Sequence, residues 1–268
     1  ASAPKSAPEK ALLLREGAVV AVSQKGQLGN PDAVVALVAN FPAGRLGDIA
    51  DSYHGITTTD LPRFARCIWE FSSVLEAWIR LQGTVSSTQQ FGGREELLLW
   101  EKGQGGIHKL REDGATVVIT GLDAWNRKGV VVNRMNLGVT MYGGDAFDTG
   151  VSVVVPRQQK DLPALWAFCS SPEFAAAIRT FNDSMVVEYI YLTKVPFDIA
   201  HWQKVAAERY PHGLPKPYSD DPTQWLFHGH PQPATDPLQV AVARLLGYRW
   251  PAETDAGMEL ADEARDWI

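Results

Sequence analysis

The chain has 268 residues, of which 45% are hydrophobic and 21% charged, and its formal net charge is −6. This composition is typical of a globular protein with one large domain or two small ones. No apolar run is long enough to cross a bilayer, and the acidic balance argues against a nucleic-acid partner. The distribution of charge weakens that last exclusion, because residues 45–160 carry 13 basic and 13 acidic residues whereas residues 161–268 carry 8 and 15. A neutral middle segment can still present a basic face.

The first hundred residues predict short helices and strands after a polar start. Residues 1–10 are small, polar and Pro-containing, which indicates a disordered linker at the edge of a fragment. Asn30 and Pro31 have the residue types of a helix N-cap and first helical position. The expected elements, in chain order, are a short helix before residue 18, a strand at 18–23, a helix at 30–42, a helical turn at 46–50, a strand at 65–71, a helix at 72–82 and a strand at 96–100.

The rest of the chain also predicts short strands alternating with helices. Ser171 and Pro172 mark a second helix start inside the apolar helical region 162–181. The expected elements are a Gly-rich turn at 101–106, a strand or helix start at 115–125, strands at 128–135, 139–144, 150–157 and 185–197, helices at 162–181, 199–210 and 238–248, and a Pro-rich loop at 211–237. This order predicts an α/β fold of the mixed α+β kind, a mixed sheet with flanking helices and a C-terminal helical extension.

Signatures of catalysis are missing. The Gly-rich run at 103–106 is too short to hold a phosphate as a P-loop does. His228 and His230 have no third ligand at metal-binding spacing and are interpreted as surface histidines of a Pro-rich loop. Cys67 and Cys169 are far apart in sequence and lie in apolar surroundings, which predicts buried free thiols in a reducing, cytoplasmic environment. We therefore expect no catalytic residue, metal site or cofactor in this chain.

The stretch LGDIADSYHGITTTD (46–60) resembles the entry to target recognition domains of type I restriction specificity subunits and TaqI-like adenine methyltransferases, which commonly open with LGDIA and then x-G-I-x-T-G. KGVVVNRM (128–135), LPALWAFCSSPEFAAAIR (162–179) and LTKVPFD (192–198) resemble later elements of these domains in the same order. Residues 211–251 look like the continuation found in large bacterial methylases of restriction–modification and phage-defence systems. Thr58-Thr59 replaces the usual Thr-Gly, and neither an Asn-Pro-Pro-aromatic motif nor a glycine motif for S-adenosylmethionine is present.

The resemblance implies a target recognition domain at 45–198, with a linker and packing segment at 1–44 and a helical, Pro-rich extension at 199–268. It also implies that this chain is the non-catalytic, DNA-reading part of an N6-adenine methyltransferase, and that S-adenosylmethionine binds in a catalytic part outside it. The expected partners are double-stranded DNA and the catalytic domain of the same parent protein, without a membrane.

Three polar segments are candidate DNA contacts, because base readout needs polar side chains on loops and phosphate contacts need Arg and Lys. The residues are Thr57, Thr58, Thr59 and Arg63 in the first segment, Lys102, Gln104 and Lys109 in the second, and Arg127, Lys128 and Arg134 in the third. Structural alternatives stay open for each: a threonine-rich sheet edge, a solvated hairpin tip, and an arginine that satisfies a buried carboxylate.

Two other functions are compatible with the sequence. The acidic C-terminal tail and the Pro-rich loop could dock a partner, which would make the chain a protein-interaction scaffold of a defence complex. A hydrolase with an unfamiliar site around Asp221, His228 and His230 is the third hypothesis. The salt dependence of binding distinguishes the DNA-reading module from the scaffold. Duplex binding weakens steeply as the salt concentration rises when several phosphates are neutralised.

Overall fold

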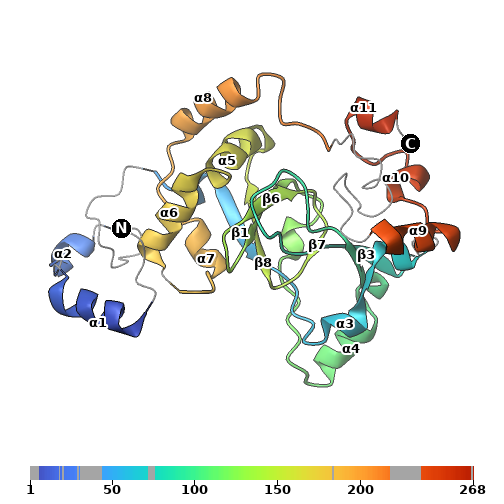
Figure 1. The fold of residues 1–268 in the computed structure, drawn as a ribbon, viewed down its shortest axis with the longest axis horizontal. Helices are drawn as coiled ribbons and strands as arrows, with labels where there is room; N and C mark the ends of the chain where they lie inside the picture. The colour runs from blue at the N-terminus through green and yellow to red at the C-terminus, as the bar shows by residue number, and fades with distance from the viewer. Residues whose placement is uncertain are drawn as a thin grey trace. The chain divides into compact units, whose positions relative to one another are not determined.

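The computed structural model describes residues 6–17, 19, 21–28, 30, 44–71, 76–182, 184–217, 237–266 and 268, and the chain divides into two compact units, 1–41 and 42–268. In the first unit, α1 (Ala7–Glu16) begins after Ser6, whose hydroxyl accepts a hydrogen bond from the Glu9 N–H, and α2 (Gln24–Gln27) begins after Ser23 (Figure 1). The strand predicted at 18–23 is absent from its described residues. The helix predicted at 30–42 lies, beyond Asn30, outside the described residues.

The first sheet of the second unit is antiparallel throughout and has the order β1-β8-β5-β6. Its strands are β1 (Ala50–His54), β5 (Gly129–Asn133), β6 (Val139–Tyr142) and β8 (Val151–Pro156). Successive side chains of a strand point to opposite faces, so Val130 and Val132 enter one core cluster whereas Val131 enters another on the other face. All residues of β5 and β8 are buried, and the strands predicted at these places are confirmed.

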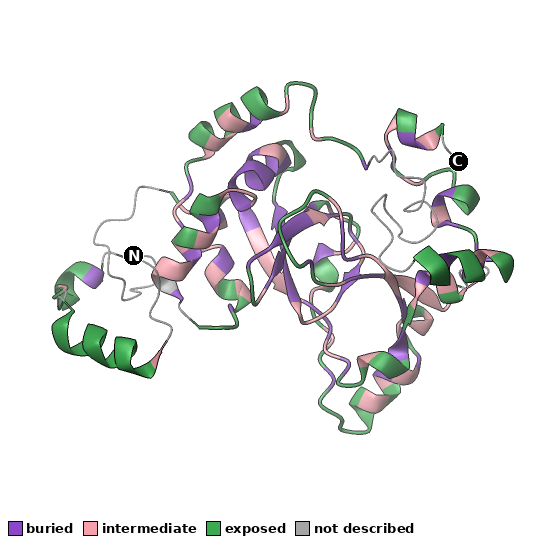
Figure 2. Cartoon of the chain, in the orientation of Figure 1, coloured by how far each residue is buried: buried purple, intermediate pink, exposed green. Residues whose placement is uncertain are grey.

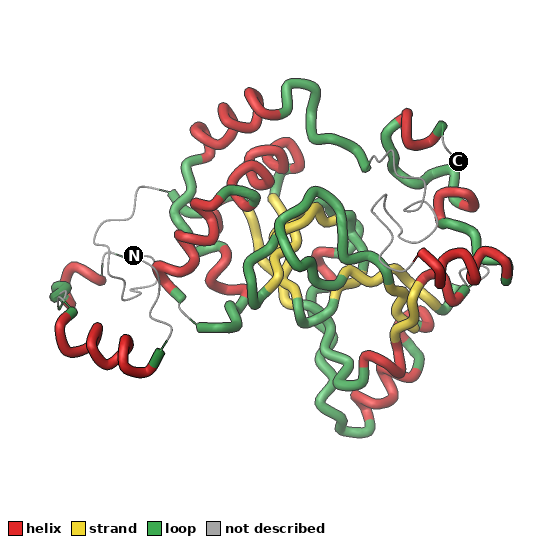
Figure 3. Tube along the Cα trace, viewed as in Figure 1, coloured by secondary structure: helices red, strands yellow, loops and turns green. Residues whose placement is uncertain are grey.

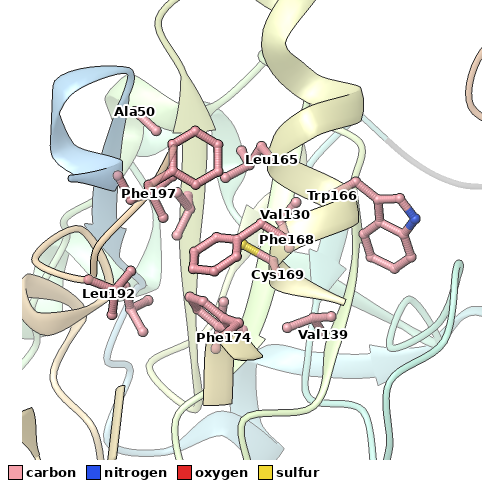
Figure 4. Close-up of a cluster of buried hydrophobic side chains, with 14 of the residues drawn as sticks. Ala50, Val130, Val139, Leu165, Trp166, Phe168, Cys169, Phe174, Leu192 and Phe197 are labelled. Carbon is pink, nitrogen blue, oxygen red and sulfur yellow. The ribbon is translucent and has the colours of Figure 1, made fainter. Parts of the chain in front are cut away.

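Helices cover one face of this sheet. They are α5 (Leu162–Cys169), α6 (Pro172–Phe181), α7 (Tyr189–Leu192) and α8 (Ile199–Arg209). Figure 4 shows Leu165 and Phe168 of α5 and Phe174 of α6 gathered against Val130 and Val139 of the sheet, and all five are buried. Ser171 occupies the N-cap position of α6, as predicted. Figure 2 shows α5 as the most deeply buried helix, whereas much of α8 is exposed.

The second sheet has the order β2-β4-β3-β7, with β3 and β7 parallel and the other pairs antiparallel. Its strands are β2 (Ala65–Cys67), β3 (Trp78–Gln82), β4 (Glu96–Leu99) and β7 (Ala146–Phe147). Two short helices, α3 (Leu61–Phe64) and α4 (Gly106–Glu112), pack on it. Phe64, Leu81, Leu98 and Ile107 are buried together in this cluster.

Single-turn helices and a C-terminal helical part complete the second unit. The 3₁₀ turns are η2 (Leu46–Asp48), η3 (Ile68–Glu70), η4 (Glu101–Gly103), η5 (Leu122–Ala124) and η6 (Gln159–Asp161). The C-terminal helices are α9 (Pro237–Leu245), α10 (Pro251–Thr254) and α11 (Asp262–Arg265), and Trp250, Leu260 and Ala264 form a small core beside them. Within the described part of the chain, no helix has the length and apolarity to span a membrane. The fold is thus of the mixed α/β class expected from the sequence.

Two predicted elements are wrong. The predicted helix at 72–82 is wrong in its last five residues, which form β3, because hydrogen bonding to β4 satisfies the backbone of Trp78 to Leu81. Residues 72–75 of this prediction lie outside the described residues. The predicted strand at 185–197 instead contains α7. Val187, Leu192 and Val195 are all buried in one cluster, and the odd spacing of five between Val187 and Leu192 would put them on opposite faces of a strand.

Other expectations hold only in part. The strand predicted at 65–71 stops at Cys67 and continues as η3, and residues 115–125 contain a single bridge at Val118 followed by η5. Both cysteines are free, Cys67 half-buried and Cys169 buried. Burial, with the negative charge of Glu70 next, raises the pKa of Cys67 to about 11, so its thiol is protonated at neutral pH and a poor nucleophile.

Asp148 follows β7 directly, and its carboxyl group shows how burial affects a charge at this position. Burial raises the pKa of its carboxyl group, although the N–H groups of Gly150 and Val151 partly offset that effect. A raised folded-state pKa means that ionisation destabilises the fold, so the cost is present at pH 7 and disappears as the pH falls through the raised value toward 3.8.

We therefore expect Asp148→Asn to raise the free energy of unfolding in urea at pH 7 and to have a smaller effect at pH 4. The amide oxygen of asparagine can keep the hydrogen bond from the Gly150 N–H, which is 2.5 Å long in the parent. The exposed Asp123→Asn is the control and should change stability at neither pH. A loss of stability at pH 7, or a gain of the same size at both pH values, would show that burial does not penalise the Asp148 charge.

Candidate nucleic-acid interface

Two of the three predicted polar segments meet at one place on the second sheet. The backbones of Thr57 and Val118 exchange hydrogen bonds, with N···O distances of 2.9 and 3.0 Å. Phe64 of α3 packs beside Gly106 of α4, where an added Cβ would lie 3.1 Å from its ring. We call the surface above these contacts the α3–α4 corner (Figures 1 and 3). Its candidate residues are Thr57, Thr59, Arg63, Lys102, Gln104 and Lys109.

The apolar sides of both segments hold the corner in place. Leu61 and Phe64 from the first segment and Ile107 and Leu110 from the second pack in the same hydrophobic cluster. At roughly 25 cal/mol per Å² of buried apolar surface, even these few side chains contribute several kcal/mol to fixing the two segments together. The polar side chains thus project from a supported base, although they come from stretches about 50 residues apart in sequence.

The loop between β4 and α4 has a specific backbone shape. Glu101, Lys102 and Gly103 have successive φ values of 51°, 57° and 77°, in the left-handed region. Two non-glycine residues in this region cost on the order of 1 kcal/mol or more each. The Gly106 N–H donates to the Glu101 carboxylate at 2.6 Å, and a side chain at Gly105 would collide with that carboxylate. Glu101 is therefore directed into the loop, while Lys102 and Gln104 are exposed.

The threonine segment is only partly available for contact. Thr59 is exposed with φ 59°, Thr57 is half-buried and Thr58 is 5% exposed. Thr57 pairs with Val118 through its backbone. Successive side chains of such an extended segment point to opposite sides, so the side chain of Thr58, the next residue, points toward the interior. We therefore leave Thr58 out of the proposed contact set. Arg63 is exposed, with its guanidinium carbon 5.1 Å from the centre of the Phe64 ring.

The charge at the corner is mixed rather than uniformly negative. Lys102 pairs with Glu76 at 2.6 Å, and both side chains are more than two-thirds exposed. A pair exposed to this degree contributes at most about 1 kcal/mol, so a phosphate can replace the carboxylate as its partner. Exposed Lys109 and Arg63 add further cations, while Asp60, Glu112 and Asp113 are exposed acids nearby in the sequence.

The three cations of the third predicted segment have partners within the fold. Lys128 precedes β5 and Arg134 follows it, so their Cα atoms are about 20 Å apart at ~3.3 Å per residue. Arg127 donates to the Tyr53 hydroxyl at 3.1 Å and to the Pro156 carbonyl at 3.3 Å. Lys128 pairs with Glu259 at 2.6 Å.

The side chain of Arg134 is bonded to other groups of the fold. Its side chain is 10% exposed and pairs with Glu188, and it donates to the Thr149 carbonyl at 2.9 Å and to the Val187 carbonyl at 3.2 Å. These contacts favour the structural alternative, in which Arg134 bonds to a carboxylate and to backbone carbonyls within the protein rather than to DNA. We therefore remove Arg134 from the proposed DNA contacts.

Sequence reasoning missed one part of the corner. The segment 115–120 pairs with Thr57 through Val118 and carries the exposed Thr116 and Thr120 beside the first polar segment. Thr120 also donates to the carbonyl of Gly55 at 3.0 Å. The hydroxyls in ATVVIT were the available signal, but the β-branched residues around them pointed to an ordinary strand.

No metal site is found in the described part of the chain, where no group of three or more His, Cys, Asp and Glu side chains could hold an ion. Asp221, His228 and His230 lie outside the described residues, so the predicted surface position of the histidines and the hydrolase hypothesis stay predictions.

No family model matches the sequence, and no curated protein matches at a significant level. A solved structure with similarity to this chain is the HsdS subunit from Thermoanaerobacter tengcongensis, with 11% sequence identity and a TM-score of 0.34. The match covers 86% of this chain and 46% of that one, so the chain spans about half the length of that subunit. At this level the likeness is loose and assigns no role to any residue of this chain.

Proposed function

We propose that the chain is a DNA-reading module and that the α3–α4 corner contacts the duplex. The observation that carries the proposal is the meeting of two polar segments, 57–63 and 102–109, on one supported base. Hydroxyl, amide and cationic side chains project there together, which is the combination that base edges and phosphates require.

The roles of the side chains follow from their chemistry. Lys102, Lys109 and Arg63 are exposed cations that would position the module on phosphates. Gln104 can pair with adenine through two hydrogen bonds, and Thr59 can donate to or accept from a base edge. The left-handed backbone at Thr59 and Lys102 supports this assignment, because strained positions cluster at functional sites.

The wider proposal is that this module belongs to a restriction–modification or phage-defence protein that methylates adenine at N6 using S-adenosylmethionine. It rests on the sequence resemblance at 46–60, 128–135, 162–179 and 192–198. The cofactor and the methyl-transfer chemistry would then belong to a catalytic part outside this chain. An Asn-Pro-Pro-aromatic motif in the reading frame that contains this sequence would support it.

DNA binding is tested by fluorescence anisotropy with labelled duplexes at several salt concentrations. We expect wild type to bind, and Lys102→Met/Lys109→Met to weaken binding to all duplexes alike. The same change should lower the slope of log K against log salt by about 0.9 for each phosphate that the protein no longer neutralises. Gln104→Met should instead reduce discrimination between sequences, by about 1–3 kcal/mol at one base pair.

The matched control is Lys204→Met, which removes an exposed lysine of α8 outside the corner. It should leave both affinity and salt slope unchanged. Absence of duplex binding by wild type at low salt contradicts the proposal. An equal effect of the Lys204 and Lys102/Lys109 changes would show that binding is a general response to charge rather than a property of the corner.

The scaffold hypothesis has one observation in its favour. Helix α9 and the residue after it expose four apolar side chains, Leu238, Val242, Leu245 and Leu246, each of them 49–88% exposed. Exposed apolar side chains gathered in one place are typical of docking surfaces. A chain that binds no duplex at low salt but retains a protein partner would favour this second function.

A further inference from the structure

A cavity outside the α3–α4 corner has an unusual electrostatic character. It has a volume of about 300 Å³, the lower end of the range of small-molecule sites. Four cationic side chains line it against two carboxylates, Asp255 and Glu259. The cations are Arg80, Arg94, Lys128 and Lys216. Of these cations, Lys128 belongs to the third polar segment predicted from the sequence, and Arg80, Arg94 and Lys216 belong to none of the three.

The most informative residue of the cavity is Arg80, whose guanidinium has no partner among the described residues. It lies on β3, is partly buried, and makes no side-chain hydrogen bond or ion pair with any described residue. A guanidinium has five N–H donors and no way to lose its charge at ordinary pH, so withdrawing it from water without an acceptor is costly. Burial, followed by the positive charge of Arg94, lowers the pKa of Arg80, and the negative charges of Asp145 and Asp255 partly offset that effect. An anion in the cavity would supply hydrogen-bond acceptors and a compensating charge for both guanidinium groups.

Arg94 is also incompletely satisfied. Its Nη2 forms an ion pair with Asp145 Oδ2 at 2.5 Å, whereas its buried Nε has no hydrogen-bond partner among the described residues. Gly143 lies beside this guanidinium, and an added Cβ there would be 3.6 Å from Arg94 Nη1. Gly143 and Arg94 both line the cavity.

The other cations are already neutralised to different degrees. Lys128 pairs with Glu259 at 2.6 Å, and exposed Lys216 approaches Asp262 at 3.9 Å. The remaining wall is apolar and aromatic, and it comprises Phe91, Met141, Tyr142, Leu162, Leu214 and Met258. Such a wall suits a planar or apolar group attached to the anion, and aromatic rings pack well against planar ring systems.

We propose that this cavity binds a phosphate group that carries an aromatic or apolar group, with Arg80 and Arg94 as the phosphate ligands. Phosphate suits the site because a guanidinium can donate two parallel hydrogen bonds to its oxygens. The phosphate could belong to a free nucleotide or to the end of a nucleic-acid strand, which share this chemistry. The inference stands apart from the α3–α4 corner, because it uses none of the residues proposed there as DNA contacts.

The experiment is calorimetric titration of the chain with adenosine monophosphate, inorganic phosphate and adenosine. We expect the monophosphate to bind more tightly than either fragment. Arg80→Met, which keeps the apolar stem of the side chain, should weaken binding at least tenfold without lowering the thermal unfolding temperature of the free protein. The control Arg209→Met removes an exposed arginine of α8 and should leave binding unchanged.

Lys216→Met is a second variant that does not depend on the folding of the sheet, because Lys216 is exposed at the edge of the cavity. It should weaken binding about threefold. Failure of wild type to bind the monophosphate at millimolar concentration, or equal affinity of wild type and Arg80→Met, overturns the proposal.

A competition arm then distinguishes the source of the phosphate. Displacement of the monophosphate by a 5′-phosphorylated oligonucleotide, but not by the same strand without its phosphate, indicates a nucleic-acid end. Failure of both strands to displace it indicates a free nucleotide. Because corner variants such as Lys102→Met should not change monophosphate binding, failure at one site is distinguishable from failure at the other.

Discussion

Replacing Phe168 with alanine is expected to lower the free energy of unfolding by about 3–5 kcal/mol, the range for removing a large side chain from a packed core. Phe168 is 3% exposed on α5. Its ring centre lies 5.4 Å from that of Phe174, 5.2 Å from that of Phe197 and 5.1 Å from that of Trp202. The side chain therefore joins α6, the segment before α8, and α8 itself to the helix that covers the first sheet.

Urea unfolding followed by tryptophan fluorescence measures this loss. Phe168→Leu retains much of the volume and should cost distinctly less than Phe168→Ala. The matched surface control is Met185→Ala, because Met185 is 74% exposed, and it should change stability by no more than about 0.5 kcal/mol. A loss below about 1 kcal/mol for Phe168→Ala would mean that α5 is not the element that holds the helical layer on the sheet.

The sequence predicts the parts of this fold whose signals are local. The runs of valine in β5 and β8 and the Ser171-Pro172 helix start need no knowledge of the rest of the chain, and the structure places the elements where they were expected. Helix α8 is similar, because Asp198 caps it by accepting hydrogen bonds from two N–H groups of its first turn. β3 could not be predicted in this way, because its strand conformation depends on pairing with β4.

The candidate site shows the same limit. Thr59, Lys102, Gln104 and Lys109 are recognisable as polar residues of glycine-containing or turn-like segments. Their gathering at one corner depends on the packing of Phe64 beside Gly106, 42 residues apart, which no local pattern reveals. Arg80 was missed for a related reason. The sequence predicts a helix at 72–82, in which Arg80 is one more polar residue, and only the packing around β3 partly buries it against the cavity.

Arg134→Met is expected to lower the free energy of unfolding by about 2–3 kcal/mol and to leave DNA affinity and its salt slope unchanged. The stability loss follows from the acceptors that lose their donor, namely the carbonyls of Thr149 and Val187, since unsatisfied buried polar groups cost about 1–3 kcal/mol each. Glu188 adds less, because its side chain is 51% exposed and water can solvate it once the arginine is gone.

This result would distinguish the structural role of Arg134 from the phosphate contact that its sequence context suggests. Both hypotheses allow weaker DNA binding by a protein that is partly unfolded, so binding is compared at a temperature where the variant is fully folded by circular dichroism. There, removal of a phosphate contact would lower the salt slope by about 0.9, as for Lys102. A structural cation leaves the slope unchanged, because its donors were already occupied by Glu188, Thr149 and Val187 and released no ions from the duplex. Stable folding of Arg134→Met together with a reduced slope would instead restore Arg134 to the interface, and would require its network with Glu188 to open when DNA binds.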